Sequence, residues 1–214
     1  MKRAKGKVET DILLIDIVGF SLLSDDEQFL TVNLLNDGID ESLHFIGIPD
    51  VLDDAMEVVR GMVPTGDGCY VILNPKLSGY APILALGLRN ILLYKSRQAG
   101  GLFSGVRVSA HTGVVIPFKD ATGKENFIGS GMNNCARIQS IPDFLKSEAA
   151  SFAGDENWVN VSTACWTRFN QKFDHSQLNN NGFRFSEQFQ FKDKHGISHA
   201  CLFIDLSRVW VSGL

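Results

Sequence analysis

The sequence predicts an α+β fold, in which helices flank a mixed, mostly antiparallel sheet. Two short apolar segments, 57–63 and 69–73, are joined by a turn-forming stretch at 64–68 that is typical of a hairpin. Longer segments with a broad apolar face and helix-capping residues lie between the strand-like segments. No internal repeat, low-complexity tract or linker interrupts this arrangement, so we expect a single domain over residues 8–214.

The elements are expected in the following order. The short, apolar and β-compatible segment Asp11–Asp16 predicts a buried central strand. Ser24 precedes a run of acids that ends at Glu27, which is a capping signal for a helix. The hairpin strands follow, and the later elements are a helix over 77–97 that ends at Gly100-Gly101, strands over 106–112 and 114–118, a polar loop over 119–126, a helix over 130–140, a strand over 158–162, a helix over 163–173, and closing antiparallel strands over 183–191 and 199–205.

Composition limits the possible function classes. The 214 residues suffice for a core of normal size, and the net charge of −4 argues against a nucleic-acid partner. The basic segment 1–7 is expected to be a disordered tail. The longest apolar run, 81–88, is far shorter than the ~20 residues that cross a bilayer, so no membrane partner is expected.

The four cysteines lie far apart in the sequence, at positions 69, 135, 165 and 201. They form no C-x-x-C motif and have no histidine pair nearby, so structural zinc and a disulfide framework are both unexpected. Reduced thiols in a cytoplasmic protein are the expectation that follows.

Two carboxylates stand at the ends of apolar segments. Asp16 closes the first strand, and Asp67 lies in the turn of the predicted hairpin. Taken alone, each has an ordinary reading, since Asp is common in turns and Gly-Asp-Gly is a frequent hairpin sequence. Taken together, a central strand and a neighbouring hairpin bring two oxygen ligands to one place, which suits Mg²⁺ or Mn²⁺. Two such ions serve phosphoryl chemistry.

Two further segments add groups that suit a phosphate-containing substrate. Gly19 and Phe20 lie between the first strand and the first helix, where backbone N–H groups and a glycine permit close approach of a triphosphate. Phe20 has the alternative role of a core aromatic. Asn133 and Arg137 are four residues apart and share a helix face, where Arg137 could stabilise developing negative charge and Asn133 could position a ribose. The alternative is a solvated helix surface.

In this order the motifs resemble the catalytic domain of class III nucleotidyl cyclases. The family pattern D-I-x-G-F corresponds to 16–20, G-D-x corresponds to 66–68, and G-x-x-x-N-x-x-x-R corresponds to 129–137. The resemblance spans about residues 8–203 and implies a ferredoxin-like core and a homodimer with shared active sites. It further implies that Asp16 and Asp67, with the carbonyl of Ile17, hold two Mn²⁺ or Mg²⁺ ions. Asn133 and Arg137 would then act on the transition state, and Lys192 or Lys194 would bind phosphate.

Two positions depart from the members of this family that use purines. Those members carry Lys or Glu where this chain has Val63, and Asp or Cys where it has Asn126. Valine cannot hydrogen-bond a base edge, and Asn126 both donates and accepts. The combination resembles the stand-alone pyrimidine cyclases of bacterial anti-phage (Pycsar) systems, whose product signals to a separate cyclic-nucleotide-binding effector.

This resemblance implies that UTP is converted to 3′,5′-cyclic UMP and pyrophosphate. Production of cyclic CMP is the next alternative, and adenylate cyclase activity follows it. The non-enzyme alternative is a module of the same fold that only binds nucleotide. Degenerate domains of this kind usually lose an acid or the arginine, whereas Asp16, Asp67 and Arg137 are all present here.

Overall fold

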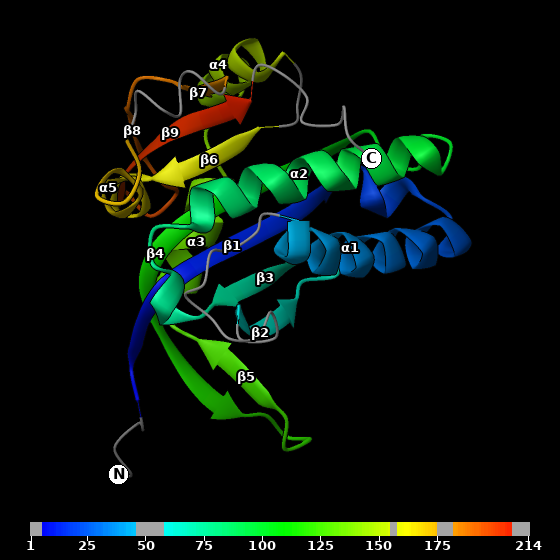
Figure 1. Cartoon of the computed structure of the whole chain (residues 1–214), viewed down its shortest axis with the longest axis horizontal. Helices are drawn as coiled ribbons and strands as arrows, with labels where there is room; N and C mark the ends of the chain where they lie inside the picture. Colours follow the sequence, from blue (N-terminus) through cyan, green and yellow to red (C-terminus); the bar gives the residue numbers. More distant parts are fainter. Residues whose placement is uncertain (1–5, 46–57, 155–157, 175–181, 207–214) are drawn as a thin grey trace.

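A computed structural model describes residues 6–45, 58–154, 158–174 and 182–206 of the chain (Figure 1). Most of the expected tail and Glu57, the first residue of the expected hairpin, lie outside the described residues. The strands are β1 (Val8–Val18), β2 (Val59–Pro64), β3 (Gly68–Leu73), β4 (Gly105–Lys119), β5 (Glu125–Ile128), β6 (Val159–Ser162), β7 (Phe183–Phe185), β8 (Phe189–Lys192) and β9 (Ser198–Leu206). The helices are α1 (Asp25–Phe45), α2 (Ala81–Gln98), α3 (Ser130–Gln139), α4 (Asp143–Ala153) and α5 (Thr163–Asn170), together with the short 3₁₀ helices η1 (Phe20–Leu22) and η3 (Pro75–Leu77).

The strands form a nine-stranded sheet, in which seven follow the order β2-β3-β1-β4-β6-β9-β7 and the other two pair off this path, β5 with β4 and β8 with β9. Within the described residues, β4 and β6 pair in parallel and the other neighbours pair antiparallel. The predicted α+β class with a mixed, mostly antiparallel sheet is therefore confirmed. No helix in the described parts of the chain combines the length and the apolar character needed to cross a lipid bilayer.

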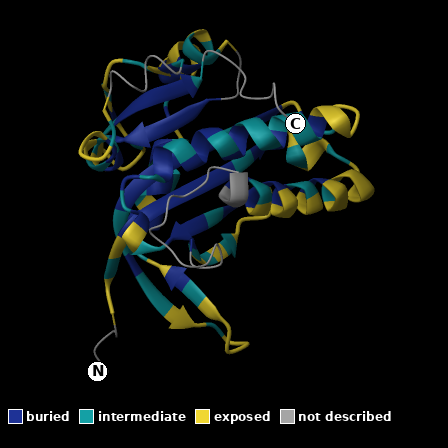
Figure 2. Ribbon diagram, viewed as in Figure 1, coloured by how far each residue is buried: buried dark blue, intermediate teal, exposed yellow. Residues whose placement is uncertain are grey.

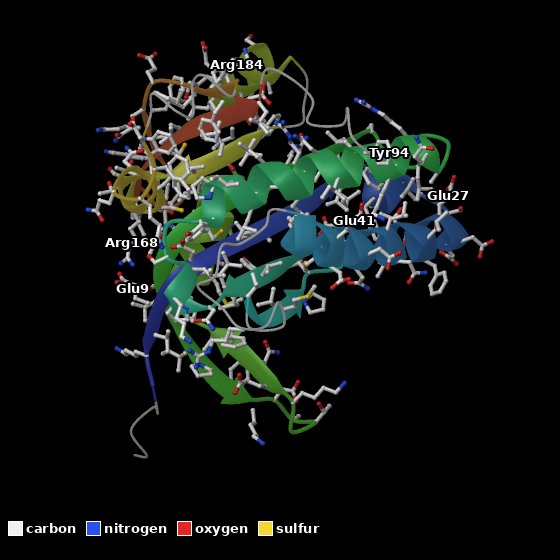
Figure 3. The ribbon with its side chains drawn as sticks, viewed as in Figure 1. Glu9, Glu27, Glu41, Tyr94, Arg168 and Arg184 are labelled. Carbon is white, nitrogen blue, oxygen red and sulfur yellow. The ribbon has the colours of Figure 1, made fainter. Side chains whose placement is uncertain are left out.

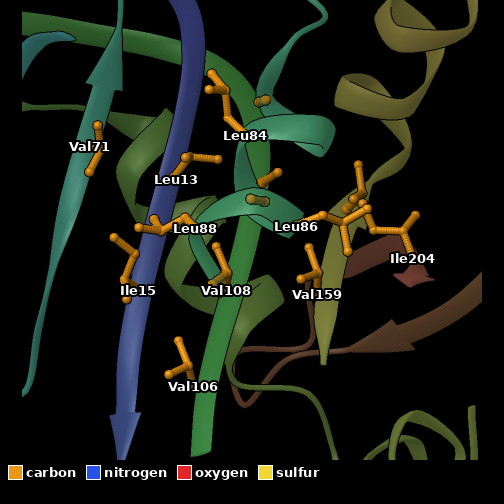
Figure 4. Close-up of a cluster of buried hydrophobic side chains, with 14 of the residues drawn as sticks. Leu13, Ile15, Val71, Leu84, Leu86, Leu88, Val106, Val108, Val159 and Ile204 are labelled. Atoms are coloured by element: carbon orange, nitrogen blue, oxygen red, sulfur yellow. The ribbon is translucent and has the colours of Figure 1, made fainter. Parts of the chain in front are cut away.

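Strand β1 is central, and its side chains alternate between the two faces of the sheet. Leu13, Ile15 and Ile17 join the apolar cluster under α1 and α2 (Figure 4), whereas Ile12 and Leu14 join a second cluster under α3. Because Asp16 continues the even-numbered series, its side chain lies on the α3 face. The expected buried strand is confirmed and extends beyond Asp11–Asp16 at both ends.

Helices cover both faces of the sheet. In Figure 1, α1 and α2 lie side by side over one face, and Gly38 of α1 permits their close packing, because a Cβ there would lie 2.5 Å from a methyl of Leu92. The outer face of α1 stays exposed (Figure 2). The predicted capping signal is confirmed, since Ser24 and Glu27 exchange hydrogen bonds at the start of α1. At the other end of the sheet, Arg168 of α5 forms an ion pair of 2.6 Å with Glu9 of β1 (Figure 3).

Two predicted boundaries are wrong for local reasons. The helix expected from residue 77 begins at Ala81, because Asn74 caps the separate 3₁₀ helix η3 through the N–H of Lys76 and Gly79 then adopts φ of +91°. The two strands expected over 106–118 are one continuous strand, β4. Gly113 does not interrupt it but lets α3 pack closely, since a Cβ there would lie 2.6 Å from the Cα of Gly131.

Three further elements differ from expectation. The end of the predicted polar loop forms β5, which pairs with the last residues of β4. Helix α4 was not predicted. The strand expected over 183–191 is divided into β7 and β8 at Ser186, whose N–H still donates to the carbonyl of Phe203 but whose hydroxyl accepts the N–H of Phe203, both at 2.9 Å. The extra strand arises from a short hairpin with β4, whereas the division arises along the pairing with β9.

Candidate active site

Asp16 lies near the end of β1, between the neighbouring strands β3 and β4. In the register of the sheet it lies opposite Gly68 of β3 on one side and Arg107 of β4 on the other. Its carboxylate is half-buried, and its Oδ2 lies 3.7 Å from Nη1 of Arg107. The end of the central strand therefore presents this carboxylate next to the β2–β3 hairpin.

The β2–β3 turn brings Asp67 to the same place, as predicted. Gly66 has φ of +101°, which forms the turn, and the carbonyl of Asp67 accepts the N–H of Ile17 at 3.0 Å. Gly68 permits this contact, because a Cβ at that position would lie 1.9 Å from the carbonyl oxygen of Ile15. The glycine that follows Asp67 is thus required by the close approach of β3 to β1.

The electrostatics of the acid pair suit a bound cation. Burial raises the pKa of Asp16, the nearby negative charge of Asp67 raises it further, and Arg107 opposes the shift. Two carboxylates and one guanidinium leave excess negative charge at this point. The oxygen-only donor set fits Mg²⁺ or Mn²⁺ and not zinc, and no cluster of three His, Cys, Asp or Glu side chains that could hold a metal occurs in the described residues.

Arg107 is a functional candidate that the sequence reasoning missed. It faces Asp16 across the β1–β4 ladder, and its guanidinium lies 4.8 Å from the ring centroid of Trp158. The aromatic ring and the carboxylate hold the arginine at the edge of the acid pair. No sequence spacing indicates this contact, because it depends on the register between two strands that are distant in the sequence.

The predicted phosphate loop follows directly after β1. Gly19 has φ of +78° and caps η1, so the chain turns sharply just beyond Asp16. The side chain of Phe20 is half-buried and packs on the main core, which agrees with its alternative role as a core aromatic. Any contact of this loop with phosphate would therefore come from its backbone.

Asn133 and Arg137 lie on α3, as predicted. They share one face of the helix, on which Asn133 is exposed to solvent. The guanidinium of Arg137 is partly exposed and forms an ion pair through Nε with Oδ2 of Asp193, at 3.1 Å. Asp193 lies in the turn between β8 and β9, and the sequence reasoning did not single it out. The sequence feature that could have indicated Asp193 is a carboxylate that lies between two lysines and next to a glycine-containing turn.

The two candidate phosphate-binding lysines flank Asp193. Lys192 ends β8 and Lys194 lies in the β8–β9 turn, and both are exposed. The ion pair between Asp193 and Arg137 places this turn beside α3. The lysine-bearing turn and the arginine helix, which are far apart in the sequence, are thus neighbours.

The two base-contacting candidates lie on strands that pack together. Gly61, two residues before Val63 on β2, contacts the ring of Phe127 on β5 so closely that a Cβ would lie 2.2 Å from it. Val63 joins the same apolar cluster as Phe127. Asn126 is half-buried, and its side-chain oxygen accepts the N–H of Phe127 at 2.8 Å. The structure therefore brings the strands of both residues together.

The acid pair and the arginine lie on the same face of the sheet but are not joined. Asp16 points to the α3 face by strand alternation, and α3 carries Arg137. In the described part of the chain, no hydrogen bond or ion pair links Asp16 or Asp67 to Asn133 or Arg137. Each group has its own counter-charge, Arg107 for the acids and Asp193 for the arginine.

Comparison with known proteins identifies the fold. No protein-family model and no curated protein sequence match the chain. Among solved structures, the catalytic core of a rhodopsin-guanylyl cyclase with converted specificity, in complex with ATPαS, aligns with a TM-score of 0.64 at 15% identity, covering 96% of this chain and 100% of that chain.

Two further structures agree. The guanylate cyclase domain of RhGC from Catenaria anguillulae, in complex with GTP, aligns with a TM-score of 0.60 at 13% identity, over 94% of this chain and 97% of that chain. A bacterial light-regulated adenylyl cyclase aligns with a TM-score of 0.55 at 12% identity, over 96% of this chain and 94% of that chain. The chain has the fold of the class III nucleotidyl cyclase catalytic domains.

Proposed function

We propose that this protein is a nucleotidyl cyclase, which converts a nucleoside triphosphate to a 3′,5′-cyclic nucleotide and pyrophosphate. The 3′-hydroxyl of the substrate attacks its own α-phosphorus, and the bond from that phosphorus to the bridging oxygen of pyrophosphate breaks. The observation that carries this proposal is the convergence of Asp16 and Asp67 at the end of the central strand of a class III cyclase fold.

The acid pair would hold the cofactor. Asp16, Asp67 and the carbonyl of Ile17 are the proposed ligands of two Mg²⁺ or Mn²⁺ ions. When bound, such ions activate the attacking hydroxyl and neutralise the leaving pyrophosphate. The chain itself contributes the backbone N–H groups of Gly19 and Phe20, which bind phosphate oxygens. Arg107, already beside Asp16, supplies a fixed positive charge at the same edge.

The α3 residues would act on the transition state. Arg137 offers a planar donor fork to the phosphoryl oxygens, and Asn133 orients the ribose. Lys192 or Lys194 binds the triphosphate from the neighbouring turn. Because the acid pair and Arg137 of one chain have separate counter-charges, we propose a homodimer in which each site combines the acids of one copy with the α3 residues of the other.

We propose a pyrimidine substrate, with UTP preferred. Val63 offers no hydrogen bond, so a buried purine edge would leave its polar groups unpaired beside it, at a cost of ~1–3 kcal/mol each. The N–H of Phe127 can only donate, so the atom of Asn126 that faces it is the side-chain oxygen. The amide NH₂ of Asn126 takes no part in this contact, and we propose that it is the group that meets the base. It donates, which suits O4 of uracil and opposes the 4-amino group of cytosine.

The proposed biological role follows from the proposed product. We infer that cyclic UMP is a second messenger of bacterial anti-phage defence and is read by a separate cyclic-nucleotide-binding effector. Cyclic CMP is the next candidate product. The resemblance to pyrimidine cyclases at Val63 and Asn126 supports this role.

Product analysis tests the proposal directly. The purified protein is incubated with equal ATP, GTP, CTP and UTP in the presence of Mn²⁺, and the products are separated by chromatography. We expect cyclic UMP as the main product, and none from an Asp67→Ala variant that remains folded. Asp120→Ala is the matched control, because Asp120 lies in another hairpin turn, between β4 and β5. Chiefly cyclic AMP or cyclic GMP would overturn the substrate assignment, and full activity of Asp67→Ala would overturn the site.

A further inference from the structure

Asp193 uses its two carboxylate oxygens for different purposes. Oδ1 accepts the backbone N–H groups of His195 at 2.8 Å and Ile197 at 2.9 Å, which closes the β8–β9 turn. Oδ2 lies 3.1 Å from Nε of Arg137 and 3.1 Å from Nε2 of His199. One oxygen therefore shapes the turn, and the other faces the proposed transition-state arginine.

A second turn in the same chain shows what the turn alone requires. In the β4–β5 connection, Oδ1 of Asp120 accepts the N–H of Thr122 at 2.8 Å and of Lys124 at 3.1 Å. The backbone bonds also correspond, since Asp120 and Asp193 each donate to the residue four positions on and each accept from the glycine three positions on. No ion pair of the Asp120 carboxylate occurs in the described residues. The contacts of Asp193 Oδ2 are therefore additional to turn formation.

The environment of Asp193 favours a fixed, charged carboxylate. Its side chain is only 7% exposed, and that of His199 is 8% exposed. Burial alone would raise the pKa of Asp193, but the N–H groups of Ile197 and His195, the His199 ring and the charge of Arg137 lower it to about 2. The carboxylate is consequently ionised at every pH at which the enzyme would work.

The contact of Asp193 with Arg137 does not involve the two terminal nitrogens of the guanidinium. Asp193 meets Nε, and no hydrogen bond or ion pair of the terminal guanidinium nitrogens occurs within the described residues. A carboxylate at Nε restricts rotation about the last bonds of the side chain and so fixes the plane in which the terminal nitrogens lie. The same carboxylate anchors the turn that carries Lys192 and Lys194 to α3.

We propose that Asp193 is a positioning residue, which orients the guanidinium of Arg137 through Nε and couples α3 to the lysine-bearing β8–β9 turn. The proposal rests on the cyclase function proposed above. It predicts that removal of the negative charge slows turnover more than it weakens substrate binding, because the orientation of Arg137 matters most when charge develops in the transition state.

The test compares Asp193→Asn with Asp120→Asn in the full chain. Asparagine retains an oxygen for the turn N–H groups but presents an NH₂ group to Arg137 and His199 in place of a charge. We expect kcat of Asp193→Asn to fall by ~10-fold or more with KM changed by less than ~3-fold, whereas Asp120→Asn leaves both unchanged. In an Arg137→Ala background, adding Asp193→Asn should have almost no further effect on kcat.

The outcomes separate this proposal from the proposed function. A wild-type protein that forms no cyclic nucleotide would overturn the function, and the positioning proposal with it. An active wild type in which Asp193→Asn and Asp120→Asn behave alike would overturn the positioning role alone. Circular dichroism monitors folding, and if Asp193→Asn unfolds, Asp193→Ser provides the same comparison, because a serine hydroxyl also accepts turn N–H groups.

Discussion

Acidification should destabilise this protein through His111, a buried histidine on β4. The side chain is 8% exposed, and its Nδ1 lies 2.9 Å from the hydroxyl of Ser162. Burial lowers the pKa of His111 from 6.5 to about 4, and the proximity of His199 contributes further. The unfolded chain therefore binds a proton more readily than the folded protein between these values. Stability is fully present above pH 6.5 and is lost as pH falls toward 4.

The magnitude follows from the shift. Linkage gives a loss of about 2 kcal/mol on going from neutral pH to pH 5, and about 3 kcal/mol at pH 4. A typical domain has ~5–15 kcal/mol of stability in total, so the loss is easily measured. Asp193 does not contribute in this range, because its pKa of about 2 places its own loss at lower pH.

The assay is urea unfolding of the wild type and of His111→Asn, followed by tryptophan fluorescence at about pH 7.5, 6 and 5. Asparagine retains a polar atom near the position of Nδ1 but does not titrate. The wild type should lose about 2 kcal/mol more than the variant between the two extremes of pH. Equal pH dependence in the two proteins would refute the reasoning, because it would mean that His111 is not held neutral by its surroundings.

Two other expectations follow from the geometry. Gly68→Ala should destabilise the fold and displace the acid pair, because its Cβ would meet the carbonyl oxygen of Ile15 at 1.9 Å. We expect a loss of more than ~2 kcal/mol by urea unfolding, and an unchanged free energy of unfolding would contradict the close contact. Mixing Asp67→Ala chains, which are inactive, with Arg137→Ala chains, which keep only residual activity, should restore activity well above that of either parent, because one site of each mixed dimer has both sets of groups intact. No recovery in heterodimers demonstrated by differential tagging would argue against shared sites.

The sequence was sufficient where the chemistry is local. The hairpin that carries Asp67 is specified by its own turn residues, and the strand before Asp16 by its own apolar run. The start of α1 is specified by the Ser24–Glu27 exchange. Such features depend on neighbours within a few residues, so their prediction does not require the register of the sheet. To predict that the two acids converge, it was enough to infer that the hairpin lies next to the central strand.

The sequence was insufficient where distant segments decide the environment. Arg107 becomes a partner of Asp16 only through the β1–β4 register, and Asp193 becomes a partner of Arg137 only because β8 and β9 lie beside α3. Strand β5 was missed for a different reason, because it pairs with the end of β4 across a short hairpin whose residues are too polar to show a strand pattern. Gly113 looked like a break between strands, although its role is to admit α3. Tertiary packing decides the environment at Arg107, Asp193 and Gly113.

The charges of the acid pair and of Arg137 bear on how the proposed shared site would form. If the acids and the arginine of one chain were meant to meet directly, Arg137 would be expected to pair with Asp16 or Asp67 in the absence of substrate. The acids instead face Arg107, and Arg137 instead faces Asp193. The acid half keeps a net negative charge beside Arg107, whereas Arg137 is neutralised by Asp193, so neither half carries an isolated charge at low dielectric. A triphosphate with its cations adds charge of both signs between the halves, so substrate binding and the meeting of two copies should reinforce each other.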